Sequence, residues 1–333
     1  MKRVELHGPE DVRLAEVEEP VAGPRDAVVR VEACGICGSD LGYIKLGGLA
    51  GPSGTPMPLG HELAGVVESV GSEVKGVAAG SRVAVNPLGG GVSIGNGGTE
   101  GGFARRLLVR NAADGKSLFE IPDAMPFEIG ALAEPLGVGM NAVDKSGAQP
   151  GEKVVVFGAG PIGLAAVATL RHRGFDDVVA VDLSDHRLGL ARELGARETL
   201  NAGAVNVWER LGELHGRDAL YGIPVVGSDA YIEASGAPVI PDIIANARPG
   251  ARMSVVALHR QEVPVNFMLV MMKEMQITGA MEYPDDYTLS LAVLAETDVS
   301  PMVTHRFPLE EFDAALSVAR DPKVAGKVII QPH

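Results

Sequence analysis

Two stretches of the chain hold residues that could bind a metal ion. Cys34 and Cys37 stand in CGICGSD, and His61 and Glu62 stand side by side in GHE. A thiolate, an imidazole and a carboxylate are ligands that zinc accepts, and a catalytic zinc site keeps one position open for substrate. Each of these residue types, taken singly, is also common in ordinary packing. The residues therefore indicate a possible zinc site but leave other readings open.

The two cysteines allow three other interpretations. Cys34-Gly-Ile-Cys37 has the C-x-x-C spacing of a redox pair, but such a pair opens a helix in a βαβ unit. This pair lies between a predicted strand and a glycine-rich stretch. Half of a structural zinc site would need a second cysteine pair, and the chain has only two cysteines. In the third interpretation, the thiol of Cys37 has no chemical role.

A glycine-rich segment predicts a dinucleotide site. Gly158, Gly160 and Gly163 match G-x-G-x-x-G, after the apolar strand VVVF and before the helical IGLAAVATL. These glycines permit a tight turn, a close approach to the pyrophosphate and close helix–strand packing, and the helix N-terminus faces the negative charge. Asp182 follows at the end of VVAVD, where a carboxylate binds ribose hydroxyls and favours NAD over NADP. Arg187 could lie over the adenine or its ribose.

The predicted secondary structure changes near residue 131. Residues 1–110 read as short strands and turns broken by Gly and Pro, which is typical of an all-β lobe. The Gly89–Gly102 segment is predicted to be a flexible surface loop. Beyond it, strands alternate with helices, which predicts a doubly wound parallel sheet. The predicted helices are Glu134–Ser146, Ile162–Arg173 and His186–Leu194, and the predicted strands are Lys153–Phe157, Val178–Asp182, Ala230–Glu233, Met253–Leu258 and the final KVII.

Two domains are expected from this order and from the length of 333 residues. A discontinuous catalytic domain would take residues 1–135 and 281–333, and a Rossmann domain residues 136–280. The net charge of −14 argues against nucleic-acid binding, which needs a basic face. No stretch of about 18 apolar residues or signal-peptide core occurs. With only two cysteines, a soluble cytoplasmic protein without membrane contact is expected.

The motifs together resemble those of the zinc-binding medium-chain dehydrogenases. CGICGSD, GHELAGVVESVG, LAEPLGVG and GAGPIG occur in the order of that family, and are most similar to the branch of sorbitol, threonine and butanediol dehydrogenases. The resemblance implies a GroES-like β-rich catalytic domain with a Rossmann domain. It also implies NAD-linked oxidation of a small secondary alcohol, polyol or vicinal diol to a ketone. A homodimer or homotetramer is expected.

The resemblance also assigns roles to residues near the metal. Cys37 and His61 would ligate zinc, with Asp40 holding the imidazole ring. A set of two cysteines and a histidine is excluded because there is no distant second cysteine. A carboxylate would complete the site, and both Glu62 and Glu134 are candidates.

Further expectations concern the proton path and the cofactor. Ser39 matches the relay hydroxyl of the family, whereas Gly42 stands where many relatives carry a histidine, so the proton would leave through water or another group. Lys327 resembles a basic residue that reaches the pyrophosphate, and His259 could reach the active site. Pro161, Ile162 and Val256 complete the expected cofactor contacts, and Tyr43, Met57, Leu59 and Met281 are candidate pocket residues.

The zinc content follows from the cysteine count. Many relatives bind a structural zinc through four clustered cysteines in the loop that corresponds to Gly89–Gly102, and here that loop has none. One catalytic zinc per chain is therefore expected, and no structural zinc.

Two competing functions are considered. A zinc-free quinone or enoyl reductase of the same superfamily would lack the ligands and prefer NADPH, and Cys37, His61, Glu62 and Asp182 speak against it. A non-catalytic protein with this fold would have no reason to keep the ligands together with Ser39.

Overall fold

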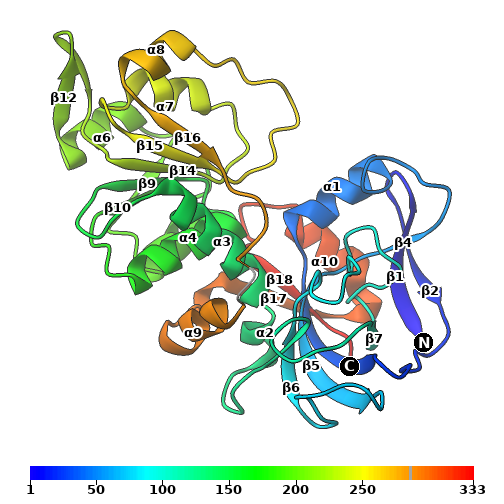
Figure 1. The fold of residues 1–333 in the computed structure, drawn as a ribbon. Helices are drawn as coiled ribbons and strands as arrows, with labels where there is room; N and C mark the ends of the chain where they lie inside the picture. Colours follow the sequence, from blue (N-terminus) through cyan, green and yellow to red (C-terminus); the bar gives the residue numbers. More distant parts are fainter. Residues whose placement is uncertain (285–286) are drawn as a thin grey trace.

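The computed structural model describes residues 1–284 and 287–333, which form two lobes (Figure 1). The beginning and the end of the chain lie together in one lobe, and the middle of the chain forms the other. Among the described residues, no helix is both long and apolar enough to cross a membrane.

The first lobe is rich in β-structure. Its larger sheet has the order β17-β18-β3-β5-β6-β8, with β7 beside β3, and a smaller sheet has the order β2-β1-β4. The strands are β1 (Lys2–Gly8), β2 (Asp11–Glu16), β3 (Ala27–Gly35), β4 (Met57–Pro58), β5 (Glu62–Val70), β6 (Arg82–Val85), β7 (Arg106–Val109), β8 (Leu118–Glu120), β17 (Val303–Pro308) and β18 (Lys327–Gln331). The helices are α1 (Gly38–Leu46), α2 (Phe127–Gly130) and α10 (Phe312–Ala319), with 3-10 turns η1 (Ser300–Met302) and η2 (Leu309–Glu311).

The second lobe contains a parallel sheet of order β11-β10-β9-β14-β15-β16. The chain adds strands in one direction from β9 and then in the other, which is the doubly wound order of a Rossmann domain. The strands are β9 (Val154–Phe157), β10 (Val178–Asp182), β11 (Glu198–Asn201), β14 (Ala230–Glu233), β15 (Arg252–Val255) and β16 (Gln276–Gly279). The helices are α3 (Ala133–Ser146), α4 (Pro161–His172), α5 (Asp185–Glu193), α6 (Val207–His215), α7 (Ile240–Asn246) and α8 (Phe267–Met272). The later helix α9 (Thr288–Glu296) lies between the lobes and contacts α2, α3 and α4. The predicted α/β class is confirmed.

Strand β9 shows why this sheet is buried on both faces. Val154 and Val156 join the core that includes α3 and α4, whereas Val155 and Phe157 join the core on the other face. Successive side chains of a strand point to opposite faces, so a continuous apolar run suits a strand covered on both sides. The functional residues therefore lie at the ends of the strands.

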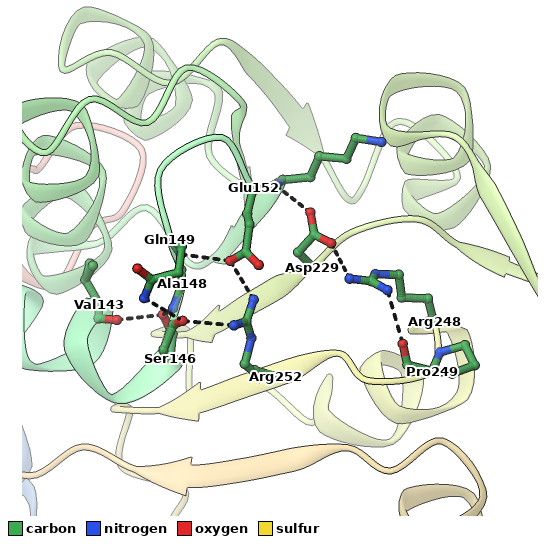
Figure 2. A network of polar contacts seen from close by, with 11 residues as sticks. Val143, Ser146, Ala148, Gln149, Glu152, Asp229, Arg248, Pro249 and Arg252 are labelled. Carbon is green, nitrogen blue, oxygen red and sulfur yellow. Dashed lines mark hydrogen bonds and ion pairs between the residues drawn. The ribbon is translucent and has the colours of Figure 1, made fainter.

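A polar network closes the amino-terminal edge of the sheet (Figure 2). Arg252 pairs with Glu152 at 2.5 Å, and Glu152 also accepts a bond from the backbone N–H of Gln149 at 2.8 Å. Asp229 forms an ion pair with Arg248. The network thus joins the connections that lead into β9, β14 and β15 at this edge of the sheet.

The structure differs from the sequence-based expectations in four places. The helix α1 lies within the segment expected to be all β, and a hairpin of β12 (Arg217–Leu220) and β13 (Ile223–Val226) was not anticipated. The strand expected over Met253–Leu258 ends at Val255, the last residue that pairs with β16. The Gly89–Gly102 segment is not a free surface loop, because Ile94 is buried in the core of the first lobe.

Candidate metal and cofactor site

Three predicted ligands meet in the first lobe. One donor atom each from Cys37, His61 and Glu62 lie within 4.8 Å of one another. Cys37 follows β3 and caps α1, while His61 directly precedes β5, which pairs with β3 in antiparallel register. The pairing of Gly35 with Glu62 sets the two ends of this strand pair side by side. Residues distant in sequence are thereby gathered at one end of the sheet.

Gly60 is required where the chain enters this site. Its φ is +94°, a conformation that side chains other than glycine rarely adopt. A Cβ at this position would also lie 2.7 Å from the backbone N of Phe103. The turn that delivers His61 therefore depends on glycine.

His61 lies between a hydroxyl and a carboxylate. Its Nε2 is 3.3 Å from Ser39 Oγ, and its Nδ1 is 3.6 Å from Asp40 Oδ1. Asp40 Oδ2 accepts a bond from the backbone N–H of Cys37 at 2.9 Å. Burial alone would lower the pKa of His61, but the charges of Asp40 and Cys37 outweigh it and raise the pKa well above its ordinary value. The imidazole is thus set in a strongly negative surrounding that suits a cation.

Glu62 has a partner that the sequence did not reveal. Lys327 Nζ lies 2.7 Å and 2.6 Å from the two carboxylate oxygens of Glu62, and also donates to the backbone O of Ile36 at 3.1 Å. Both charged side chains are almost fully buried. A Cβ at Gly35 would lie 2.2 Å from Glu62 Oε2, so this glycine makes room for the pair. Lys327 therefore lies on Glu62, whereas the family resemblance predicted a contact with the pyrophosphate.

Glu134 occupies a separate position at the start of α3. Its side chain is buried, and burial raises its pKa to about 7. Its carboxylate is not part of the group formed by Cys37, His61 and Glu62. Among the described residues, the grouping of donor atoms therefore favours Glu62 as the third ligand.

The donor set fits zinc. A thiolate, an imidazole and a carboxylate are the ligand types of catalytic zinc sites. Asp40 Oδ1 and His61 Nδ1 are buried and have no hydrogen-bond partner within the described part of the chain. A metal on the opposite ring nitrogen, Nε2, would fix the tautomer and strengthen the Nδ1–H contact with Asp40.

The glycine-rich turn has the geometry of a dinucleotide site. Gly158 follows β9 with a φ of +94°, and a Cβ on Gly163 would lie 1.7 Å from the backbone O of Gly158. Pro161 begins α4, with Ile162 next to it. A pocket of about 500 Å³ opens beside this turn and includes Gly158, Gly160, Asp182 and Arg187 in its lining.

Asp182 and Arg187 are both oriented by the backbone around this pocket. Asp182 Oδ2 accepts a bond from Ala159 N at 2.6 Å, which ties the carboxylate to the glycine-rich turn. Arg187 Nε donates to the backbone O of Ala325 at 2.9 Å, and burial lowers the pKa of Arg187. The pocket and its carboxylate fit the adenosine half of a dinucleotide.

Val256 lies one residue beyond β15. Its backbone N–H donates to Glu233 O at 3.0 Å, at the carboxyl edge of the sheet. His259 was expected to reach the active site. Its Nε2 instead lies 2.7 Å from Glu233 Oε2 at the end of β14.

The expected pocket residues have different surroundings. Tyr43 donates to Asn96 Oδ1 at 3.2 Å, and Asn96 belongs to the Gly89–Gly102 loop. Met57 and Leu59 are buried in the core, whereas Met281 is exposed. Sequence reasoning missed Tyr283, whose hydroxyl donates to Asn86 Oδ1 at 2.7 Å. Its only signal was its place two residues after Met281.

Protein contacts hold the Gly89–Gly102 loop. Glu100, the one plausible metal ligand of that loop, lies 2.9 Å from Arg110 Nη2 and 3.8 Å from Arg3 Nη1. The backbone O of Glu100 accepts a bond from Gly95 N at 2.7 Å. An ion-pair cluster therefore occupies the place where relatives were expected to have a structural zinc.

The fold has two lobes, one with a cluster of metal-ligand side chains and one with a dinucleotide-type turn. Comparison with known families agrees: residues 23–123 match the family described as Alcohol dehydrogenase GroES-like domain, and residues 161–296 match Zinc-binding dehydrogenase. Sorbitol dehydrogenase of Homo sapiens is 33% identical over 328 residues, covering 92% of this chain and 89% of that protein. L-idonate 5-dehydrogenase of Vitis vinifera is 32% identical, covering 88% and 84%.

Solved structures show the same likeness. The crystal structure of 2R,3R-butanediol dehydrogenase from Bacillus subtilis has a TM-score of 0.86 and 27% identity, covering 100% of this chain and 99% of that one. The chain belongs to the zinc-binding alcohol dehydrogenase family and is an enzyme that acts on alcohol groups.

Proposed function

We propose that this protein is a zinc-dependent, NAD-linked dehydrogenase that oxidises a secondary alcohol, polyol or vicinal diol to a ketone. The observation that carries the proposal is the grouping of Cys37, His61 and Glu62 beside Ser39. Relatives named for sorbitol, L-idonate and butanediol support the substrate class.

The metal ligands would be Cys37, His61 and a carboxylate. We favour Glu62, because its oxygen lies within 4.8 Å of the other two donor atoms, and Glu134 is the alternative. Bound zinc would supply Lewis acidity that favours the alkoxide form of the alcohol. Asp40 would hold the His61 ring through Nδ1.

Ser39 would move the alcohol proton. Its hydroxyl lies 3.3 Å from His61 Nε2 and can both accept and donate a proton. Gly42, one helical turn further along α1, has no side chain to continue the path. The proton would then leave through water.

Asp182 supports NAD as the cofactor. Its carboxylate faces the pocket beside the glycine-rich turn, where it would accept bonds from ribose hydroxyls and repel a 2′-phosphate. The hydride would pass to the nicotinamide, which is chemistry of the cofactor itself.

A panel of substrates tests the proposal. Sorbitol, other polyols, butanediols and simple secondary alcohols are each offered with NAD or NADP, before and after chelation. The proposal expects NAD reduction that chelation abolishes. A zinc-free reductase would instead reduce quinones or enones with NADPH after chelation, and a non-catalytic protein would show neither reaction.

The division of the chain and its assembly are also proposed here. We propose a catalytic domain of residues 1–135 and 281–333 and an NAD-binding domain of residues 136–280, since β17 and β18 join the sheet of β3.

We propose a homodimer or homotetramer formed through β16, an edge strand whose residues are all exposed. Exposed Met268, Met271 and Ile277 lie on or near that edge. A monomer by light scattering would contradict this assembly. The two free cysteines suit a cytoplasmic location.

A further inference from the structure

An arginine of the Rossmann lobe lies directly on the helix that follows the metal ligand Cys37. A Cβ built on Gly42 of α1 would lie 1.9 Å from Nη2 of Arg260 and 3.1 Å from its Cζ. The guanidinium therefore fills the space that a side chain at position 42 would take. Gly42 is buried and lies one helical turn after Ser39, so Arg260 stands beside the proposed reaction site.

The backbone around Arg260 is fixed by a buried glutamate. Glu233, at the end of β14, accepts bonds from Ser235 N at 2.9 Å and from Gly236 N at 3.0 Å. Its other carboxylate oxygen lies 2.7 Å from His259 Nε2. Arg260 directly follows His259, so this contact directs the loop after β15 toward α1.

Arg260 is a cation without a counter-ion. Its side chain makes no hydrogen bond or ion pair in the residues 1–284 and 287–333, and the residue is exposed. Two cations near the cofactor edge are occupied, since Arg187 binds the backbone O of Ala325 and Lys327 binds Glu62. Lys323 lies in the lining of the adenosine pocket itself. In a chain of net charge −14, an unpaired guanidinium at this position is available for an anionic ligand.

The sheet order places this cation on the path of the dinucleotide. The adenosine pocket lies at the ends of β10 and β9, marked by Asp182 and Gly158, and the next strands along the sheet are β14 and β15. A dinucleotide that runs from Asp182 toward Cys37 must pass these ends and then reach α1. Arg260 joins the end of β15 to α1 on that path.

We propose that Arg260 is a cofactor-binding residue whose guanidinium reaches from the Rossmann lobe to α1 and binds the diphosphate of the dinucleotide. Arginine presents N–H donors in a planar fork that matches two phosphate oxygens. This contact requires glycine at position 42, because only a residue without a side chain lets the guanidinium lie against α1. The inference rests on the proposed NAD-linked function.

Binding measurements test the inference without turnover. The affinity for NADH is measured by fluorescence, and ADP-ribose and 5′-AMP are measured as competitors, on the zinc-loaded wild type and on Arg260→Ala. We expect the Kd of NADH and of ADP-ribose to rise about tenfold to hundredfold, the range for charge-assisted hydrogen bonds. The Kd of 5′-AMP should change less than about twofold, because that fragment lacks the second phosphate.

Three further variants sharpen the result. Arg260→Lys keeps the charge without the fork and should lose only part of the affinity. Gly42→Ala places a Cβ where the guanidinium lies, so it should also raise the Kd of NADH. Arg217→Ala changes an exposed arginine on the β12–β13 hairpin and should have no effect.

The outcomes separate the alternatives. An unchanged NADH affinity in Arg260→Ala, or an equal loss for 5′-AMP, would overturn the inference. So would an effect confined to the KM of a phosphorylated or carboxylated polyol at saturating NAD, because the anion would then belong to the substrate. A wild type that binds no NADH would refute the proposed cofactor itself, whereas tight wild-type binding with no alcohol oxidised would refute only the proposed reaction.

Discussion

Replacing Lys327 by methionine tests which carboxylate completes the metal site. Lys327 and Glu62 are almost fully buried and joined by two contacts of 2.6 and 2.7 Å. Burial alone would lower the pKa of Lys327, but the charges of Glu62 and Cys37 raise it, so the amine is charged at neutral pH. Methionine fills similar space without charge and leaves Glu62 without its counter-ion.

The loss of unfolding free energy in Lys327→Met depends on whether zinc is bound. Removing one partner of a buried ion pair costs about 3–5 kcal/mol, and this cost is expected for the zinc-free protein. If Glu62 is a zinc ligand, the metal neutralises the carboxylate, and only about 1–2 kcal/mol should remain for the lost hydrogen bond to Ile36 O. The difference of roughly 2 kcal/mol must appear as a zinc affinity about 30-fold tighter in Lys327→Met.

Two assays measure this linkage. Zinc affinity is taken from competition with a chelating dye, and the free energy of unfolding from urea denaturation with zinc or with EDTA. Arg306→Met is a matched control, since the Arg306–Glu128 pair is exposed and should contribute about 0–1 kcal/mol irrespective of zinc. A zinc affinity in Lys327→Met that is unchanged or weaker would show that Glu62 is not the ligand and would favour Glu134.

Three other predictions concern the cofactor, the proton path and stability. The wild type should prefer NAD to NADP by at least about tenfold in kcat/KM, roughly 1.4 kcal/mol, and Asp182→Ala should weaken that preference; equal rates with both cofactors in the wild type would refute the role of Asp182. Ser39→Ala should keep its zinc by metal analysis but lose about 10²–10⁴-fold in rate with a changed pH profile, and an unchanged profile would leave Ser39 as a turn residue. Burial raises the pKa of Tyr231 from its usual value to about 12, so the unfolded state loses its proton first and the free energy of unfolding should fall by roughly 2–3 kcal/mol as the pH rises from about 10 to beyond 12. Tyr231→Phe should remove that fall in alkaline urea titrations, because phenylalanine has no phenolic proton to lose; an identical fall in the variant would contradict the assignment.

The local signals of the sequence predicted the cofactor turn well. The apolar run before GAGPIG and the helix after it appear as β9 and α4, and β10 has the predicted bounds of Val178–Asp182. These elements follow from short-range patterns, namely a continuous apolar run for a strand buried on both faces and the spacing of three glycines at the turn. Cys37 and His61 were also identified from short motifs, and the structure brings them together. Their role as metal ligands stays a prediction.

Features that depend on distant pairing were not predictable. Lys327 reaches Glu62 because β18 pairs with β3, through Ile329 and Gly35, while β3 pairs with β5 through Gly35 and Glu62. No local pattern reveals that register. The β12–β13 hairpin was missed because its strands are largely exposed and its turn, at Tyr221 and Gly222, lacks the usual Asn-Gly or Asp-Gly signal.

The Arg260–Gly42 contact is a second feature that local sequence patterns could not predict. The sequence shows only that position 42 lacks a side chain. It does not show that a residue more than two hundred positions later lies in that space. The contact between the lobes, and any role in cofactor binding, becomes visible only when the loop after β15 is seen against α1.

Zinc titration of the chelated enzyme tests the central claim most directly. Zinc is removed, returned in steps, and NAD reduction is followed with the best alcohol of the panel. Activity should rise linearly and stop rising at one zinc per chain, and Cys37→Ala should recover none. Activity that persists without zinc, or a break at two zinc ions per chain, would contradict the assignment of a single catalytic zinc to Cys37, His61 and Glu62.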